Sequence, residues 1–244
     1  FCSTGAQGFI RNLFVSEIIG QVLQAFKYIS TNTEFPNIKN IVIMGMGEPL
    51  LNFSNIINVI KILLDKRAFK LSKQHITLST SGIVPGINKL RKSRIDIRLA
   101  ISLHAPNDNL RNKIMPINYR YNIANMLLAV KQYIQYSKAN RGGVTIEYVM
   151  LAGINDSSEH ARQLAKLLST LPSKINLIPW NSFFGSTFSC SSDQKIFNFY
   201  KILTGKGLTT TIRNNRGKDI NAACGQLSGQ ISTTKKIEKI QIIF

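Results

Sequence analysis

The sequence is poor in acidic residues, in cysteine and in long apolar runs, and each scarcity excludes a class of protein. Only 12 Asp and Glu stand against 31 Lys and Arg, so the chain is not an acidic protein. Three cysteines, widely spaced, are too few for a disulfide scaffold and indicate a reducing compartment, which we expect to be the cytoplasm. No uninterrupted apolar run approaches the ~20 residues of a membrane span, so we expect no membrane association.

The excess of basic residues gives a formal charge of +19 and favours a nucleic-acid partner, because a basic surface attracts phosphate backbones. Lys, Asn and Ile are abundant along the whole chain, so compositional drift remains the alternative explanation. With 44% hydrophobic and only 18% charged residues, the 244 residues can form one sizeable core.

Short β-branched runs alternate with helical patterns along the chain. The predicted strands are Ile38–Met44, His75–Ser79, Ile97–Ser102, Val144–Met150, Lys174–Ile178 and Leu208–Ile212. The predicted helices are Ser16–Ser30, Ser54–Leu64, Ile123–Ser137, Ser157–Ser169 and Asp193–Thr204, with a short one at Pro85–Leu90. Asp156 and Glu159 resemble a capping pair, and Asn181–Ser192 is typical of a long loop. This alternation predicts an α/β fold with a parallel sheet, either an open barrel or a doubly wound sheet.

Polar residues follow four of the predicted strands. Gly45–Pro49 follow the first, Ser79–Gly82 the second, Ser102–His104 the third and Pro179–Asn181 the fifth. In parallel sheets, functional sites lie where the strands end. If these strand ends converge on one rim, they form a polar pocket there.

The chain opens with FCSTGAQGFIRNL, which resembles the end of the cluster motif C-x3-C-x2-C in a family of bacterial radical S-adenosylmethionine (SAM) enzymes, the rRNA adenine-C2 methyltransferases. The resemblance continues in the same order through MGMGEPLLN, TLSTSG, AISLHAPND, VTIEYVML, KINLIPWN and AACGQL. It covers nearly the whole chain. The motifs are highly specific together, although each is weak alone.

This resemblance implies that residues 1–244 are the radical SAM catalytic core of a longer protein. The implied fold is α/β, a partial (β/α)6 barrel whose first strand and N-terminal accessory domain precede Phe1. The implied substrates are 23S rRNA and certain tRNAs, and the implied electron donor is of the flavodoxin type. We expect the enzyme to be a monomer.

The cofactors that the resemblance implies are a 4Fe-4S cluster and SAM. Cys2 matches the third cluster ligand, a soft thiolate suited to iron. The other two ligands would lie upstream, so the chain by itself cannot hold a complete cluster. The implied SAM-binding residues are Gly47, Glu48, Ser79, Ser102, Leu103, His104 and Asn181. Taken one at a time, Cys2, Glu48 and His104 are also ordinary structural residues, and His75, His160 and Cys190 match no functional position.

Cys224, in AACGQL, matches the cysteine that this family methylates. Arg213, Arg216 and Lys218 lie close to it in sequence and would favour its thiolate. The resemblance implies that SAM first methylates Cys224 and that a radical from a second SAM activates this methyl group. The activated carbon then adds to carbon 2 of adenine, an atom too electron-poor to attack SAM directly. The resolving cysteine and the general base of the family would lie upstream of Phe1.

Three alternatives stay open at this point. The nearest is the related enzyme that methylates carbon 8 of the same adenine, because the two activities share most of these motifs. The second is an inactive RNA-binding remnant, in which the basic charge survives but the cluster does not. The third is an α/β barrel that acts on a small phosphorylated metabolite, which would leave Cys2 and Cys224 without roles.

Overall fold

A computed structural model describes residues 1–32, 38–183, 185–214 and 225–226. Its strands form one parallel sheet in chain order, and all six predicted strands are confirmed. They are β1 (Ile41–Ile43), β2 (Ile76–Thr80), β3 (Arg98–Ser102), β4 (Val144–Met150), β5 (Ser173–Pro179) and β6 (Thr209–Ile212).

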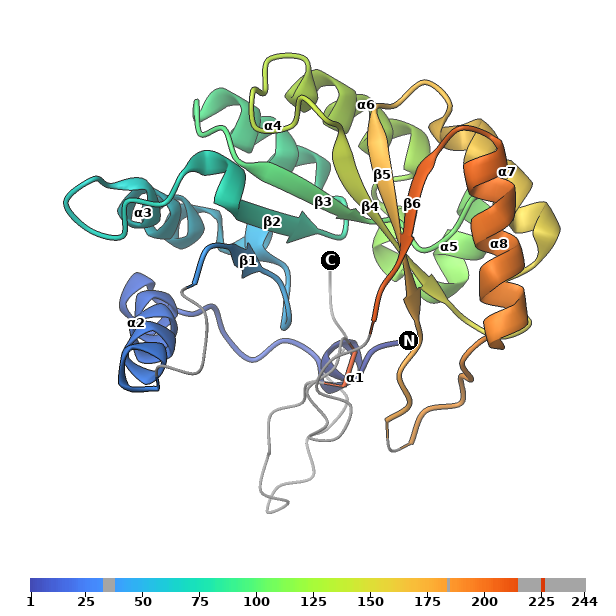
Figure 1. Ribbon diagram of the computed structural model, residues 1–244, viewed down its shortest axis with the longest axis horizontal. Coiled ribbons are helices and arrows are strands. Elements are labelled where there is room, and N and C mark those ends of the chain that lie inside the picture. Colours follow the sequence, from blue (N-terminus) through green and yellow to red (C-terminus); the bar gives the residue numbers. More distant parts are fainter. Residues whose placement is uncertain (33–37, 184, 215–224, 227–244) are drawn as a thin grey trace.

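Helices connect these strands, and the predicted helices are all present, with ends shifted by a few residues. The helices are α1 (Ser3–Gln7), α2 (Val15–Thr31), α3 (Phe53–Leu64), α4 (Val84–Lys92), α5 (Asp108–Ile114), α6 (Ile123–Ile134), α7 (Ser158–Leu168) and α8 (Asp193–Gly205). Three short 3-10 segments are η1 (Pro49–Asn52), η2 (Lys73–His75) and η3 (Pro116–Tyr119). Figure 1 shows α3, α4, α6, α7 and α8 outside the curved sheet, and α1 on its open side between the edge strands β1 and β6. The fold is therefore the expected open, partial barrel.

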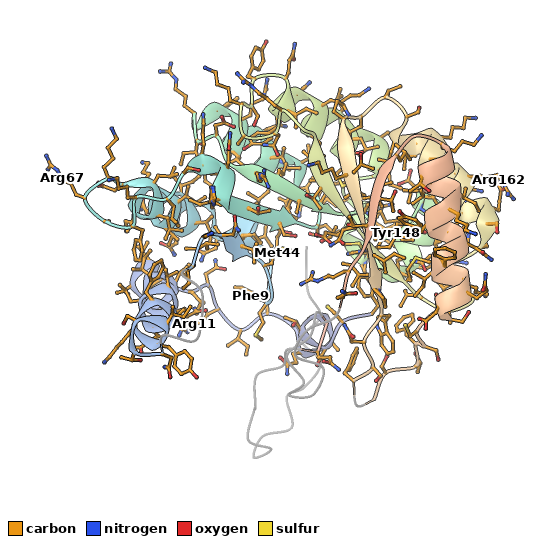
Figure 2. All side chains as sticks on the ribbon, viewed as in Figure 1. Phe9, Arg11, Met44, Arg67, Tyr148 and Arg162 are labelled. Atoms are coloured by element: carbon orange, nitrogen blue, oxygen red, sulfur yellow. The ribbon has the colours of Figure 1, made fainter. Side chains whose placement is uncertain are left out.

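The strands alternate between an apolar outer face and a polar inner face, as a period of two requires. Leu78 of β2 and Tyr148 of β4 are fully buried in the core that the sheet shares with the outer helices. The phenol ring of Tyr148, which lies between the sheet and α8 in Figure 2, contacts Phe199 at 5.2 Å between ring centroids. The opposite face carries one polar row of directly paired residues across β3 to β6: Ser102, Glu147, Asn176 and Thr211. The row lies at the carboxyl ends of β3 and β6 and in the middle of the longer strands β4 and β5.

The predicted capping pair at the start of α7 is wrong. The N-cap is Ser157, whose hydroxyl oxygen accepts a hydrogen bond from the main-chain N–H of His160. Asp156 lies one residue too early to cap the helix, and its carboxylate instead accepts the hydroxyl of Ser191 at 2.9 Å. This contact joins the loop after β4 to the loop after β5, which the sequence pattern could not show.

Two expectations concern residues outside this chain. The additional strand and the accessory domain would precede Phe1, so they stay predictions, as does the assignment of residues 1–244 to one catalytic core.

In the described part of the chain, no helix is both long and apolar enough to cross a membrane. Basic side chains project from widely separated places, such as Arg67 after α3 and Arg162 on α7, at opposite ends of the view in Figure 2.

Candidate functional site

The loop after β1 turns sharply and places Glu48 against the end of β2. Gly45 and Gly47 have φ values of +129° and +80°, which residues with a Cβ rarely adopt. The Oε1 atom of Glu48 accepts the N–H of Leu50 at 3.0 Å, and its Oε2 atom accepts both the N–H and the hydroxyl of Ser81 at 2.7 Å. Glu48 is therefore a half-buried, anchored carboxylate and not an exposed turn residue.

The end of β2 divides its hydroxyl groups between the two faces of the sheet. Ser79 is buried and lies on the inner face, in the register row of Ala100 and Thr145. The side chain of Thr80 lies on the outer face of the sheet. Its Oγ1 atom accepts hydrogen bonds from the N–H groups of Gly82 and Ile83 at 3.1 and 3.4 Å. Only Ser79 and Ser81 of this strand end are thus available to the inner rim.

The three predicted SAM contacts at the end of β3, Ser102, Leu103 and His104, lie in different environments. The Leu103 side chain is completely buried in the apolar core and does not face the rim. Its N–H donates to the carbonyl of Glu147 at 3.1 Å, so Leu103 can contribute little beyond backbone shape. Ser102 is half-buried, and its hydroxyl belongs to the polar inner row.

His104 is a buried residue in the left-handed conformation, with φ of +59°. Its Nδ1 atom accepts the N–H of Val149 at 3.0 Å, so the neutral ring carries its proton on Nε2. Burial, followed by the nearby charge of Arg111, lowers the pKa of His104 to about 3. The imidazole is therefore uncharged near neutral pH and offers one N–H donor.

The start of the chain is held against the ends of β3 and β5. The indole N–H of Trp180 donates to the carbonyl of Phe1 at 3.0 Å, and the Phe1 ring meets the His104 ring edge-on at 4.9 Å. Asn181, which follows Trp180, is buried at 3% exposure. Because Cys2 follows Phe1, these contacts place the predicted cluster ligand beside the predicted SAM residues.

Cys2 is half-buried and caps α1, where its sulfur accepts the N–H of Gly5 at 3.3 Å. The next residue, Ser3, donates its main-chain N–H to the carbonyl of Gly225 at 2.8 Å. Gln226 in turn donates its side-chain amide to the carbonyl of Ser182 at 2.7 Å. Cys224 itself lies outside the described residues, but its sequence neighbour Gly225 is joined to the segment that carries Cys2.

The donor groups at this rim fit SAM, and Cys2 fits one ligand of a cluster. SAM carries an ammonium, a carboxylate and ribose hydroxyls, which the carboxylate, hydroxyl, imidazole and amide groups of Glu48, Ser79, Ser102, His104 and Asn181 complement. No three His, Cys, Asp or Glu residues among those described are grouped so that they could hold a metal ion.

Sequence reasoning included Ser81 among the polar residues after β2 without giving it a role, and it missed Arg111 and Glu147. Glu147 is 5% exposed, accepts the Asn176 amide at 2.8 Å, and has a pKa raised by burial. Glu147 lies two residues after Thr145 in β4, and this spacing could have predicted that both side chains lie on the same, inner face of the sheet. Arg111 carried no signal, because a basic residue on a short polar helix is ordinarily exposed. His75, left as structural, binds the Lys39 carbonyl at 2.8 Å through Nδ1.

Known proteins resemble this chain in sequence and in fold. The family model of the radical SAM superfamily matches residues 1–165. The chain is 62% identical over 231 residues to the dual-specificity RNA methyltransferase RlmN of Buchnera aphidicola subsp. Schizaphis graminum (strain Sg), with 95% of this chain and 63% of the relative covered. It is 57% identical over 245 residues to RlmN of Wigglesworthia glossinidia brevipalpis, with 100% and 63% covered.

A crystal structure of a radical SAM methyltransferase from Sphaerobacter thermophilus is similar in fold as well as in sequence. It superposes with a TM-score of 0.87 at 40% identity, and the match covers 93% of this chain and 65% of that one. This chain thus spans somewhat less than two thirds of the length of these relatives.

Proposed function

The chain belongs to the radical SAM superfamily, and from that premise we propose that it is the catalytic core of a longer enzyme that methylates carbon 2 of an adenine in 23S rRNA and in certain tRNAs. Membership of the superfamily brings a 4Fe-4S cluster and SAM as cofactors. The named relatives, which are dual-specificity RNA methyltransferases, support the RNA substrate. The observation that carries the proposal is the hydrogen bond from Ser3 to Gly225, since it joins the cluster motif to the segment of AACGQL.

Each residue of the rim has a proposed role. Cys2 contributes one thiolate to the cluster, and Glu48 accepts the ammonium group of SAM. Ser79, Ser102, His104 and Asn181 bind its remaining polar groups, while Gly47 and Leu103 shape the backbone that presents them. When bound, the cluster and SAM supply the methyl group and the radical chemistry that an electron-poor carbon requires.

Cys224 is the proposed carrier of the methyl group. Its sequence neighbours Arg213, Arg216 and Lys218 favour a thiolate by their charge. The target adenine must leave its stack to reach this sulfur, which is easiest in a loop or bulge of RNA. The net charge of +19 supports an RNA partner. We further propose a cytoplasmic monomer that receives its electron from a flavodoxin-type donor.

The test is peptide mass spectrometry of the Cys224 segment, with the longer protein isolated from cells that supply SAM and iron. We expect a methyl group on Cys224. We also expect 2-methyladenosine from the wild-type protein and none from Cys224→Ala. Cys190→Ala is the matched control, because Cys190 lies in an exposed loop, and it should retain activity. Full activity of Cys224→Ala would overturn the mechanism, whereas 8-methyladenosine as product would identify the related carbon-8 enzyme.

A further inference from the structure

Arg111, on α5, is the largest completely buried side chain in the described part of the protein. Its guanidinium donates to three carbonyl oxygens at two neighbouring strand ends. Nε binds the carbonyl of Leu103 at 3.1 Å, while Nη2 binds the carbonyls of Ser102 at 3.1 Å and Ser81 at 2.6 Å. Arg111 therefore ties the carboxyl end of β2 to that of β3.

The charge of Arg111 is buried without a direct carboxylate partner. Its Nη1 atom donates to the side-chain oxygen of Asn118 at 2.8 Å, and Asn118 donates in turn to Asp108 at 2.8 Å. None of the ion pairs among the described residues includes Arg111. Burial lowers its pKa to about 10, so it stays charged near neutral pH. Burying such a charge costs free energy, which the four hydrogen bonds of the guanidinium offset.

Ser81 connects this cation to Glu48. Its carbonyl accepts from Arg111, while its N–H and its hydroxyl both donate to Oε2 of Glu48. A carboxylate has about four lone-pair sites, two on each oxygen. Ser81 fills both sites of Oε2, and the N–H of Leu50 fills one on Oε1. No other described residue donates to Glu48, so within the described part of the chain one site on Oε1 remains open.

Close packing leaves these groups little freedom. A Cβ atom on Gly82, next to Ser81, would lie 2.5 Å from the sulfur of Met126. A Cβ atom on Gly86 of α4 would lie 2.6 Å from the Cβ of Leu50 in η1. The loop after β2 is thus packed closely against α6, and α4 is packed closely against the segment that follows Glu48, which limits the movement of both segments.

We infer that Arg111 and Ser81 are positioning residues for SAM: Arg111 fixes the end of β2, Ser81 saturates Oε2 of Glu48, and the remaining site on Oε1 receives the ammonium group. This inference deepens the proposed function and rests on it. Without the Ser81 hydroxyl, Oε2 regains an open site, and the carboxylate is held by two main-chain N–H groups instead of three donors. Both oxygens of Glu48 then have an open site, so the carboxylate no longer offers the ammonium group one defined acceptor.

The first experiment measures SAM affinity by calorimetry, with the longer, reconstituted protein. Ser81→Ala should weaken SAM binding about tenfold, because a carboxylate that has lost one of its three fixed donors must be ordered again when SAM binds. Ser81→Thr retains a hydroxyl and should restore most of the affinity. Ser93→Ala is the matched control, because the Ser93 hydroxyl binds the Leu90 carbonyl at the end of α4 and should not affect SAM. In turnover, Ser81→Ala should raise KM for SAM and leave kcat within about twofold, as the loss of uniform binding requires.

The second experiment identifies the ammonium as the affected group. S-adenosylhomocysteine is compared with its deaminated analogue, which lacks only the amine. Ser81→Ala should weaken the binding of S-adenosylhomocysteine and leave the affinity for the deaminated analogue unchanged, because only the amine binds Oε1. If Ser81→Ala weakens both ligands equally, Ser81 supports the site in general and the inference is wrong.

Arg111→Lys tests the cation itself. The single ammonium group of a lysine side chain cannot reach all the carbonyl groups that the planar guanidinium binds. Like Ser81→Ala, this variant should therefore weaken the binding of S-adenosylhomocysteine and leave the binding of the deaminated analogue unchanged. We call the difference between the two affinities the amine preference. If Arg111→Lys folds and keeps that preference, Arg111 has no positioning role. If the wild-type protein binds no SAM at all, the proposed function fails; if it binds SAM and Ser81→Ala binds it equally well, only this inference fails.

Discussion

The main-chain N–H of Ser3 donates a hydrogen bond to the carbonyl of Gly225 at 2.8 Å, which joins residues from opposite ends of the described chain. Each partner is the immediate sequence neighbour of a cysteine that the proposed function requires. The contact explains why the two motifs, FCSTG and AACGQL, occur together although they are so far apart in sequence. It also makes the backbone of Gly225 a target for mutation.

Gly225→Ala tests that anchor. Gly225 has φ of +86°, a conformation that costs a residue with a Cβ about 1 kcal/mol. Among the described residues, a Cβ at this position would meet only the Cβ of Cys2, at 3.8 Å. We expect RNA methylation to fall several-fold while iron content stays unchanged. Gly153→Ala is the matched control, since Gly153 also has positive φ, at +69°, with open space around it. Equal losses in the two variants would show a general backbone effect.

Cys2→Ala should abolish the cluster in the longer, anaerobically reconstituted protein. The reason is the loss of one of the few thiolates that hold the iron. Iron analysis and visible absorption are the measurements. Cys190→Ala should keep both signals, because Cys190 is exposed in the loop after β5. Wild-type iron content and absorption in Cys2→Ala would remove Cys2 from the cluster.

Glu48→Ala should weaken SAM binding about tenfold to a hundredfold and leave the cluster assembled, since hydrogen bonds to charged groups contribute about 1.5–3 kcal/mol. Calorimetry with SAM is the measurement. Glu159→Ala removes an exposed carboxylate that pairs only with neighbours on α7, Arg162 and Gln163, and should bind SAM normally. Unchanged affinity in Glu48→Ala would exclude Glu48 from the site.

Glu147→Gln should change how stability depends on pH. Burial raises the pKa of Glu147 in the folded state above its ordinary value of 4.5, so the folded protein binds more protons than the unfolded chain between these two pKa values. Stability from this group is fully present below pH 4.5 and falls as pH rises through the folded-state pKa. Thermal unfolding of Glu147→Gln should therefore show a flatter pH profile and a higher Tm than wild type at pH 8. An identical profile would show that Glu147 does not titrate differently in the two states.

The strands and most helices could be predicted from the sequence because their signals are local. Positions at strand ends marked as rim residues the set Glu48, Ser79, Ser102, His104 and Asn181. The capping residue of α7 was missed by one position, because Asp156 and Ser157 are both good caps and only the packing of Asp156 against Ser191 decides between them.

By itself, the sequence determined the order of the elements and the polar residues at the strand ends, since both depend on side-chain period and on turn chemistry. Tertiary structure alone decided which partners those residues have. The burial of Arg111 depends on α5 packing under two strand ends, and the anchoring of Glu48 depends on Ser81 reaching it from the next strand. Such contacts join residues distant in sequence, and their energies depend on exclusion from water, which no local pattern records.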